Sequence, residues 1–147
     1  MTAWAPMGAG VLTGKYTRGA STTPEDSVRA AGNEDSLTDR NLRIAREVDR
    51  TADELGATSA QVAIAWVRQR GKRIIPVVGV RTVEQMHDIL GSLDVALSAG
   101  QLAQLDEVGR VELGFPQDFL RAPTGQLVYG DLEAKIDLPQ TAPRYGA

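Results

Sequence analysis

The segment from Ile74 to Gln85 constrains the fold most, because a short apolar strand runs directly into the start of a helix. Thr82 and Gln85 have the spacing of a capping box, in which the threonine hydroxyl accepts the Gln85 amide and the glutamine reaches back to the Thr82 amide. The positive end of the helix dipole and the remaining amides then point beyond the strand, where Arg81 adds a full charge. The segment therefore predicts an anion site suited to a phosphate.

Short strands alternate with longer helices along the rest of the chain. Apolar residues recur every three or four positions in the helical segments, and capping boxes precede three of these segments, at Thr58/Gln61, Thr82/Gln85 and Ser98/Gln101. The predicted order is a strand within residues 3–7, helices over 38–55 and 58–71, a strand over 74–78, and helices over 82–90 and 98–108. This alternation favours an α/β fold with parallel strands covered by helices.

Two further segments are predicted to lack regular secondary structure. Residues 8–37 are rich in Gly, Ser, Thr and Pro and predict a long loop after the first strand, and residues 111–147 predict an irregular C-terminal tail. We expect residues 1–147 to form a single partial domain, because two strands are too few for a parallel sheet buried on both faces. Pro76 lies inside the second strand, where we expect it to mark the strand's start or a bulge.

Composition narrows the classes of function. The 147 residues are 42% apolar and 24% charged, with a net charge of −3, no cysteine and one histidine. Such a chain has no electrostatic footprint for nucleic acid and few groups for a metal site, so we expect neither partner. No long apolar run predicts a membrane span and no basic leader opens the chain, so we expect a cytoplasmic protein.

Several candidate residues have a second interpretation. Arg81 could bind a phosphate or only pair with Glu84 on the surface. The segment Gly8–Lys15 departs from the standard nucleotide-loop spacings, which leaves either a plain turn or a backbone cradle for phosphate. Trp4 could stack on a flat ligand or pack in the core. The lone helical His87 is most simply a surface residue, and the charges between Arg40 and Glu54 indicate a solvated, ion-paired helix face.

Several motifs occur together in a characteristic order. They are Trp4-Ala5-Pro6-Met7-Gly8, Leu12-Thr13-Gly14-Lys15-Tyr16, Ala60-Gln61-Val62-Ala63-Ile64-Ala65-Trp66, the block from Gly79 to Leu97, and Leu113-Gly114-Phe115-Pro116-Gln117-Asp118-Phe119-Leu120. Together they resemble the C-terminal part of the aldo/keto reductase family, and the resemblance covers essentially the whole chain. The family folds as a (β/α)8 TIM barrel with its ligand site at the C-terminal ends of the strands. The resemblance implies about two strand-helix units of that barrel plus the tail.

The resemblance also implies a cofactor, NADP, from which the family passes hydride to a small-molecule carbonyl substrate. Trp4 corresponds to the aromatic residue that stacks on nicotinamide, and the loop bordering the pyrophosphate corresponds to Ala5, Met7 and Ala9. The phosphate on the adenosine ribose would be met by Gly79, Val80 and Arg81, with Gln85 and Asp88 beside it and the adenine. Two positions depart from the family pattern: Ile89 stands where asparagine is common, and Ala5 where serine is common.

The resemblance leaves catalysis outside this chain. The family's catalytic Asp, Tyr, Lys and His belong to the first half of the barrel, so we assign no catalytic residue and no metal ligand here. The chain is interpreted as the NADP-binding part of an oxidoreductase that is inactive by itself. The alternatives are a non-catalytic nucleotide-binding module or subunit, and an inactive truncated remnant. Unpaired strand edges also predict self-association.

Overall fold

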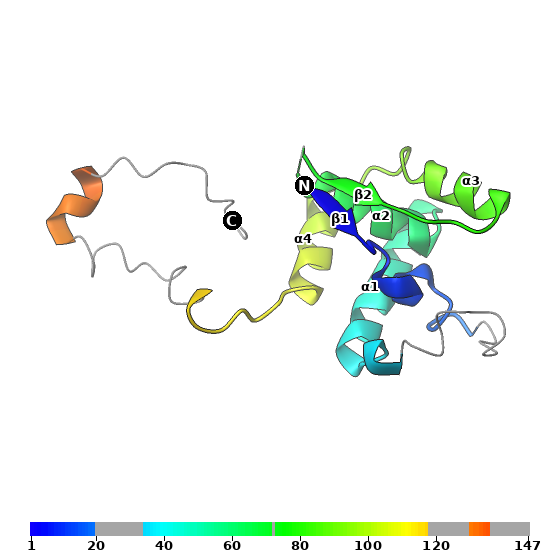
Figure 1. Ribbon diagram of the computed structural model, residues 1–147, viewed down its shortest axis with the longest axis horizontal. Helices are drawn as coiled ribbons and strands as arrows, with labels where there is room; N and C mark the ends of the chain where they lie inside the picture. The colour runs from blue at the N-terminus through cyan, green and yellow to red at the C-terminus, as the bar shows by residue number, and fades with distance from the viewer. Residues whose placement is uncertain (20–33, 72, 118–129, 136–147) are drawn as a thin grey trace. The chain divides into compact units, whose positions relative to one another are not determined.

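The computed structural model describes residues 1–19, 34–71, 73–117 and 130–135 of the 147-residue chain. The chain divides into two compact units, residues 1–110 and residues 111–147. Within its described residues, the first unit holds two strands, four α-helices and two short 3-10 helices (Figure 1). The described part of the second unit holds one 3-10 helix, η5 (Gly130–Lys135). That both units belong to one partial domain stays a prediction.

The two strands are β1 (Thr2–Trp4) and β2 (Ile75–Val77). They run parallel, with Thr2 opposite Ile75 and Trp4 opposite Val77. The amide of Ile75 donates to the Met1 carbonyl at 2.9 Å. Both strands are shorter than the predicted segments, but their parallel pairing confirms the α/β class for this part of the chain.

Pro76 lies in the middle of β2, opposite Ala3, so the prediction of a strand start or bulge was wrong. The ladder explains why a proline is tolerated. Because the Ile75 amide points toward β1, the nitrogen of the next residue points to the other edge of β2, where no described strand pairs with it. No ladder hydrogen bond is therefore lost at Pro76.

The four predicted helices are confirmed as α1 (Asp39–Leu55), α2 (Ser59–Gln69), α3 (Val83–Gly91) and α4 (Ala99–Val108). Helix α1 begins after its cap Thr38 and ends at Gly56, which adopts the left-handed conformation with φ 61°. The predicted capping boxes Thr58/Gln61 and Ser98/Gln101 both form. Local capping chemistry therefore fixes where these helices begin.

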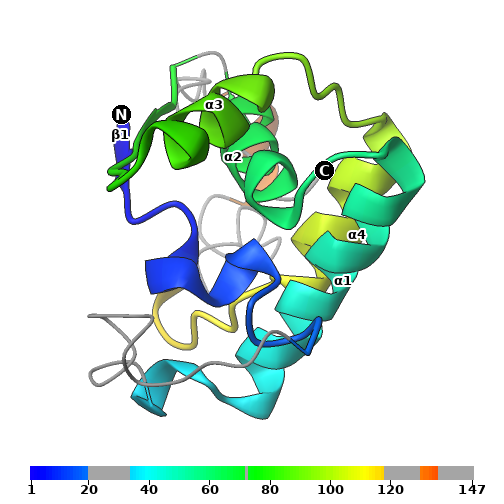
Figure 2. The same cartoon turned by 90° about the vertical axis from the view of Figure 1, so that its right-hand side faces the viewer.

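The hydrophobic core of the first unit lies between α1, α2 and α4. Helices α1 and α4 lie side by side (Figure 2), and the wholly buried side chains between the helices include Val48, Val62 and Leu105. Trp66 of α2 is 9% exposed, and its ring nitrogen donates to Asp106 Oδ1 of α4 at 2.7 Å. The prediction that Trp66 is a core residue is confirmed.

The predicted loop over 8–37 contains more structure than expected. Residues Gly8–Thr13 form a 3-10 helix, η1, and Glu34–Ser36 form another, η4, while residues 20–33 lie outside the described part. Positive φ angles at Gly10 (97°) and Ala9 (53°) turn the chain sharply inside η1. Val11 is buried, so η1 is anchored against the body of the unit instead of projecting as a loop.

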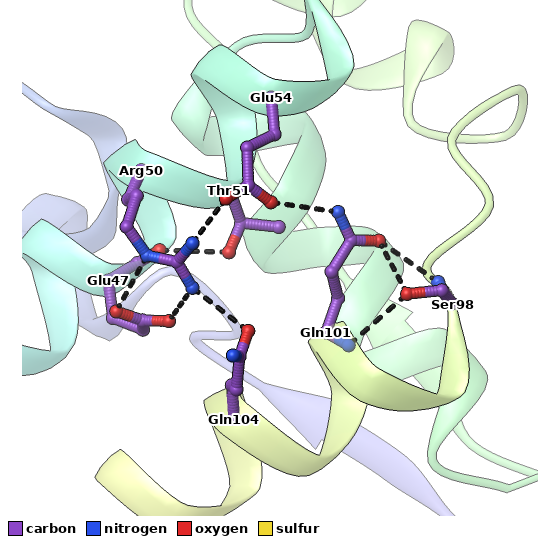
Figure 3. Close-up of polar contacts among 7 residues, drawn as sticks. All are labelled: Glu47, Arg50, Thr51, Glu54, Ser98, Gln101 and Gln104. Atoms are coloured by element: carbon purple, nitrogen blue, oxygen red, sulfur yellow. Dashed lines mark hydrogen bonds and ion pairs between the residues drawn. The ribbon is translucent and has the colours of Figure 1, made fainter.

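The predicted ion-paired face of α1 is confirmed at Arg50. Its guanidinium pairs with Glu47 and Glu54 of the same helix and donates to Gln104 of α4 at 2.9 Å (Figure 3). Arg40 donates to the carbonyls of Gly109 and Arg110, the two residues that follow α4, at 3.1 and 2.9 Å. These contacts tie both ends of α1 to α4, although exposed pairs of this kind each contribute little to stability.

Candidate functional site

A cavity of about 600 Å³ opens where the chain leaves both strands. Its walls come from the segment after β1, the start of α2, the segment after β2 and helix α3. The lining residues are Met7, Ala9, Gly10, Thr13, Lys15, Thr58, Ala60, Gly79, Val80, Arg81, Gln85, Asp88 and Ile89. The carboxyl ends of parallel strands are the usual place for a ligand in α/β proteins.

The start of α3 differs in one respect from the capping box predicted there. The Thr82 hydroxyl accepts the Gln85 amide at 3.2 Å as expected. The Gln85 side chain instead accepts the amide of Arg81 at 2.9 Å, one residue before the cap. Because Gln85 binds the backbone at Arg81, it braces the turn between β2 and α3 and withdraws that amide from any ligand.

Charges of both signs line the cavity. Lys15 and Arg81 bring positive charge from opposite segments, and Asp88 brings a carboxylate from α3. The Lys15 ammonium lies 4.6 Å from the centre of the Tyr16 ring, a cation–π distance. No ion pair joins Arg81 to Glu84, so the surface-pair interpretation of Arg81 has no support in the geometry. The cavity combines two cations with one anionic acceptor.

The Asp88 carboxylate is held by two side chains from the start of α2. Its Oδ1 accepts a hydrogen bond from the Thr58 hydroxyl at 2.8 Å and from Gln61 Nε2 at 3.0 Å. Gln61 Nε2 also donates to the Asp88 carbonyl at 3.0 Å. These bonds connect the start of α2 to α3 at the edge of the cavity wall that Thr58 and Asp88 form, and they fix one oxygen of the carboxylate.

Of the residues predicted for the site, two do not line the cavity. Trp4 is 87% exposed at the end of β1, which contradicts core packing, and Ala5 follows it with a positive φ of 49°. The other predicted residues, Met7, Ala9, Gly79, Val80, Arg81, Gln85 and Asp88, all lie on the cavity wall. Whether any of them holds a cofactor stays a prediction at this point.

Sequence reasoning did not assign several lining residues to the site, of which Thr13, Lys15 and Thr58 are polar or charged. Lys15 stood in a glycine-containing segment whose spacing matched no standard nucleotide loop, and Thr58 was recognised only as a helix cap. Nothing local in the sequence indicates that a cap on α2 faces α3. The other lining residues that were not assigned are Gly10, Ala60 and Ile89.

The described residues contain no group of three or more His, Cys, Asp or Glu side chains that could hold a metal ion. No helix in the described ranges is long and apolar enough to cross a membrane. His87 is exposed on α3, in agreement with its interpretation as a surface residue.

Comparison with known proteins identifies the family. The model of the aldo/keto reductase family matches residues 1–110, well over half of the chain. This chain belongs to the aldo/keto reductase family. The two parallel strands and their helices are consistent with part of the aldo/keto reductase barrel, as the resemblance predicted.

Named relatives share moderate identity with this family member. A probable aryl-alcohol dehydrogenase of Saccharomyces cerevisiae is 27% identical over 80% of this chain and 36% of its own length. A probable voltage-gated potassium channel subunit beta of Arabidopsis thaliana is 38% identical over 65% of this chain and 30% of its own length. An uncharacterized oxidoreductase of Bacillus subtilis is 31% identical over 74% of this chain and 31% of its own length. The chain thus spans about a third of the length of these relatives.

Proposed function

We propose that this chain is the NADP-binding part of an aldo/keto reductase, with the cavity beside Arg81 as the place for the adenosine end of the cofactor. The proposal rests on the convergence of Lys15 and Arg81 on a cavity at the carboxyl ends of both strands. A dinucleotide phosphate carries phosphate groups at two places, and cations from two different segments of the chain are a matching arrangement. The family match to residues 1–110 supports the same assignment.

The chemistry of the lining residues fits the cofactor. Arg81, exposed beside Gly79 and Val80, is assigned to the phosphate on the adenosine ribose, because a guanidinium binds phosphate by paired hydrogen bonds. Lys15, with Met7 and Ala9 on the same wall, is assigned to the diphosphate. Gln85 and Asp88 are assigned to the neighbourhood of the ribose phosphate and adenine. The exposed Trp4 ring is assigned to the nicotinamide.

The chemistry follows from the cofactor, and this chain supplies its attachment. When bound, NADPH supplies a hydride for a small-molecule carbonyl substrate. The residues on the cavity wall bind and orient, and none of them is assigned to proton transfer. We therefore propose that the 147-residue chain by itself binds the cofactor without turnover, which is also what a non-catalytic nucleotide-binding module would do.

The test compares two nicotinamide cofactors on one pair of variants. We expect the purified chain to bind NADPH more tightly than NADH in a fluorescence titration. Arg81→Ala should weaken NADPH binding by about tenfold to a hundredfold, as expected for losing a charge-assisted contact, and should leave NADH binding nearly unchanged. Arg43→Ala is the matched control, because Arg43 is an exposed arginine of α1 that does not line the cavity.

The outcomes separate the proposal from its rivals. Absence of NADPH binding at high micromolar concentration contradicts the proposal and favours an inactive remnant. Binding with equal loss in the Arg81 and Arg43 variants places the phosphate elsewhere. Consumption of NADPH with an aromatic aldehyde, a substrate suggested by the aryl-alcohol dehydrogenase relative, would contradict the assignment of no catalytic residue to this chain.

A further inference from the structure

We infer that Thr58 and Gln61 are positioning residues that orient the Asp88 carboxylate so that its free oxygen selects a purine with an exocyclic amino group. The inference rests on the proposed function and extends it from cofactor binding to the choice of base. Its basis is a set of hydrogen bonds between the first turn of α2 and the last turns of α3.

The two oxygens of the Asp88 carboxylate differ in their hydrogen bonds. Asp88 Oδ1 receives two donors, the Thr58 hydroxyl at 2.8 Å and Gln61 Nε2 at 3.0 Å. Among the described residues, none donates to Oδ2. Asp88 is half-buried on the cavity wall, and an ionised carboxylate only accepts hydrogen bonds. A ligand group that meets Oδ2 must therefore be a donor, as the 6-amino group of adenine is, whereas hypoxanthine has an acceptor carbonyl in place of that amino group.

The two donors to Asp88, Thr58 and Gln61, are themselves held in place by hydrogen bonds. The Thr58 hydroxyl accepts the Gln61 amide at 3.1 Å as the cap of α2, so its proton is directed to Asp88. Gln61 Oε1 accepts the Thr58 amide at 3.2 Å, which leaves its Nε2 facing Asp88. The capping box of α2 thus fixes the donor groups as well as the helix start.

Gly91 leaves room for the Gln61 side chain beside Asp88. A Cβ atom at position 91 would lie 2.5 Å from Gln61 Nε2, closer than any real contact. The glycine at the end of α3 therefore leaves room for the Gln61 amide beside Asp88. Two helices consequently cooperate to keep one side chain in one orientation.

A matched pair of substitutions isolates this role. Gln61→Glu keeps the capping acceptor, because glutamate serves equally well in a capping box, but it removes the donor and sets a negative charge against Asp88. Gln101→Glu makes the same change in the capping box of α4. There Gln101 Nε2 donates to Glu54 Oε2 at 3.1 Å, away from the cavity (Figure 3). The two variants share the local chemistry and differ in the carboxylate they disturb.

The experiment measures a ratio of affinities. NADPH and its reduced hypoxanthine analogue are titrated by nicotinamide fluorescence against the full 147-residue chain. We expect the unmodified protein to prefer NADPH by about tenfold, the Gln61→Glu variant to lose most of this preference, and the Gln101→Glu variant to keep it. Thr58→Ser, which retains the hydroxyl, should also keep the preference, whereas Thr58→Val should lose it.

The ratio distinguishes positioning from general support of the fold. If Gln61→Glu weakened both dinucleotides by the same factor, Gln61 would be a purely structural residue and the inference would be overturned. Equal binding of both dinucleotides by the unmodified chain overturns it as well, while leaving the proposed function in place. Binding of neither dinucleotide overturns the proposed function and the inference together.

Discussion

At the start of α3, three side chains accept hydrogen bonds from backbone amides. Gln85 accepts the Arg81 amide, Thr82 accepts the Gln85 amide, and the carboxylate of Glu84 accepts its own amide and the Thr82 hydroxyl. Few backbone amides at the start of α3 therefore remain available to a ligand. The cation side chains of Lys15 and Arg81 therefore carry more of the proposed phosphate recognition than the dipole-based prediction assumed.

Glu84 provides a pH-dependent test of this arrangement. The hydrogen bond from its own amide and that from Thr82 lower the pKa of Glu84 below the ordinary 4.5. Since the folded pKa is lower than the unfolded one, the charged carboxylate stabilises α3 above the unfolded pKa, and this is lost as the pH falls through the folded value. Thr82→Ala should raise the pKa of Glu84 toward 4.5, as followed by carbon NMR of the carboxyl group.

A threonine elsewhere supplies the control for this titration. Thr51→Ala removes a hydroxyl that donates only to the Glu47 carbonyl, so the pKa of Glu84 should not change. A Glu84 titration that is the same in Thr82→Ala and in the unmodified chain would show that the side-chain hydrogen bond contributes nothing.

Among the elements, the packing of α2 against the end of α4 depends on a glycine, Gly109, which has no side chain. Trp66 of α2 lies against the end of α4, where it also donates to Asp106. A Cβ atom at Gly109 would lie 2.8 Å from Trp66 Cη2 and 3.0 Å from the Leu105 carbonyl. The close approach of α2 and α4 therefore requires glycine at this position, although its φ of −82° suits any residue.

Glycine-to-alanine substitutions in α4 and at its C-terminal cap should change the free energy of unfolding in opposite directions. Gly109→Ala should destabilise the chain by about 1–3 kcal/mol, because the rigid indole must move. Gly100→Ala, where the nearest atom is Ser98 Oγ at 4.0 Å, should stabilise it by about 0.5–1 kcal/mol through helix propensity. Urea unfolding measures both. A Gly109→Ala variant as stable as Gly100→Ala would mean that Trp66 is not packed as described.

At the scale of the whole first unit, the two-stranded sheet leaves apolar side chains uncovered. The face opposite α2 carries Trp4, Ile75 and Val77, which are 87%, 64% and 47% exposed, respectively. The outer edge of β2 lacks a donor at Pro76, whereas β1 presents its backbone groups on its outer edge. We propose that β1 is the edge through which copies of this chain associate.

Sedimentation velocity tests this proposal. The 147-residue chain should form dimers or larger species at micromolar concentration, and Trp4→Asp should shift it toward monomer by placing charge on the uncovered face. Leu55→Asp, at the exposed end of α1, changes an apolar residue outside the sheet and should leave association unchanged. A monomeric, cooperatively melting chain at all concentrations would disprove the proposal.

The sequence alone determined the features that depend on neighbours along the chain. Helix boundaries followed from caps such as Thr58 and Ser98, since a side chain and the amides three residues on are always within reach. The same short-range reasoning predicts an anion site between Gly79 and Gln85; both of these residues and Arg81 line the cavity, and that they bind an anion stays a prediction. The motif order indicated the family that the comparison then established.

Tertiary structure decided what meets across the cavity. Lys15 lies more than sixty positions before Arg81, and Thr58 lies thirty before Asp88, so no periodicity or spacing joins them. The pairing of the strands also explains why Pro76 is harmless inside β2. Local capping is a short-range interaction encoded by residue type. The juxtaposition of distant side chains depends on how strands and helices pack, and only the packed structure specifies it.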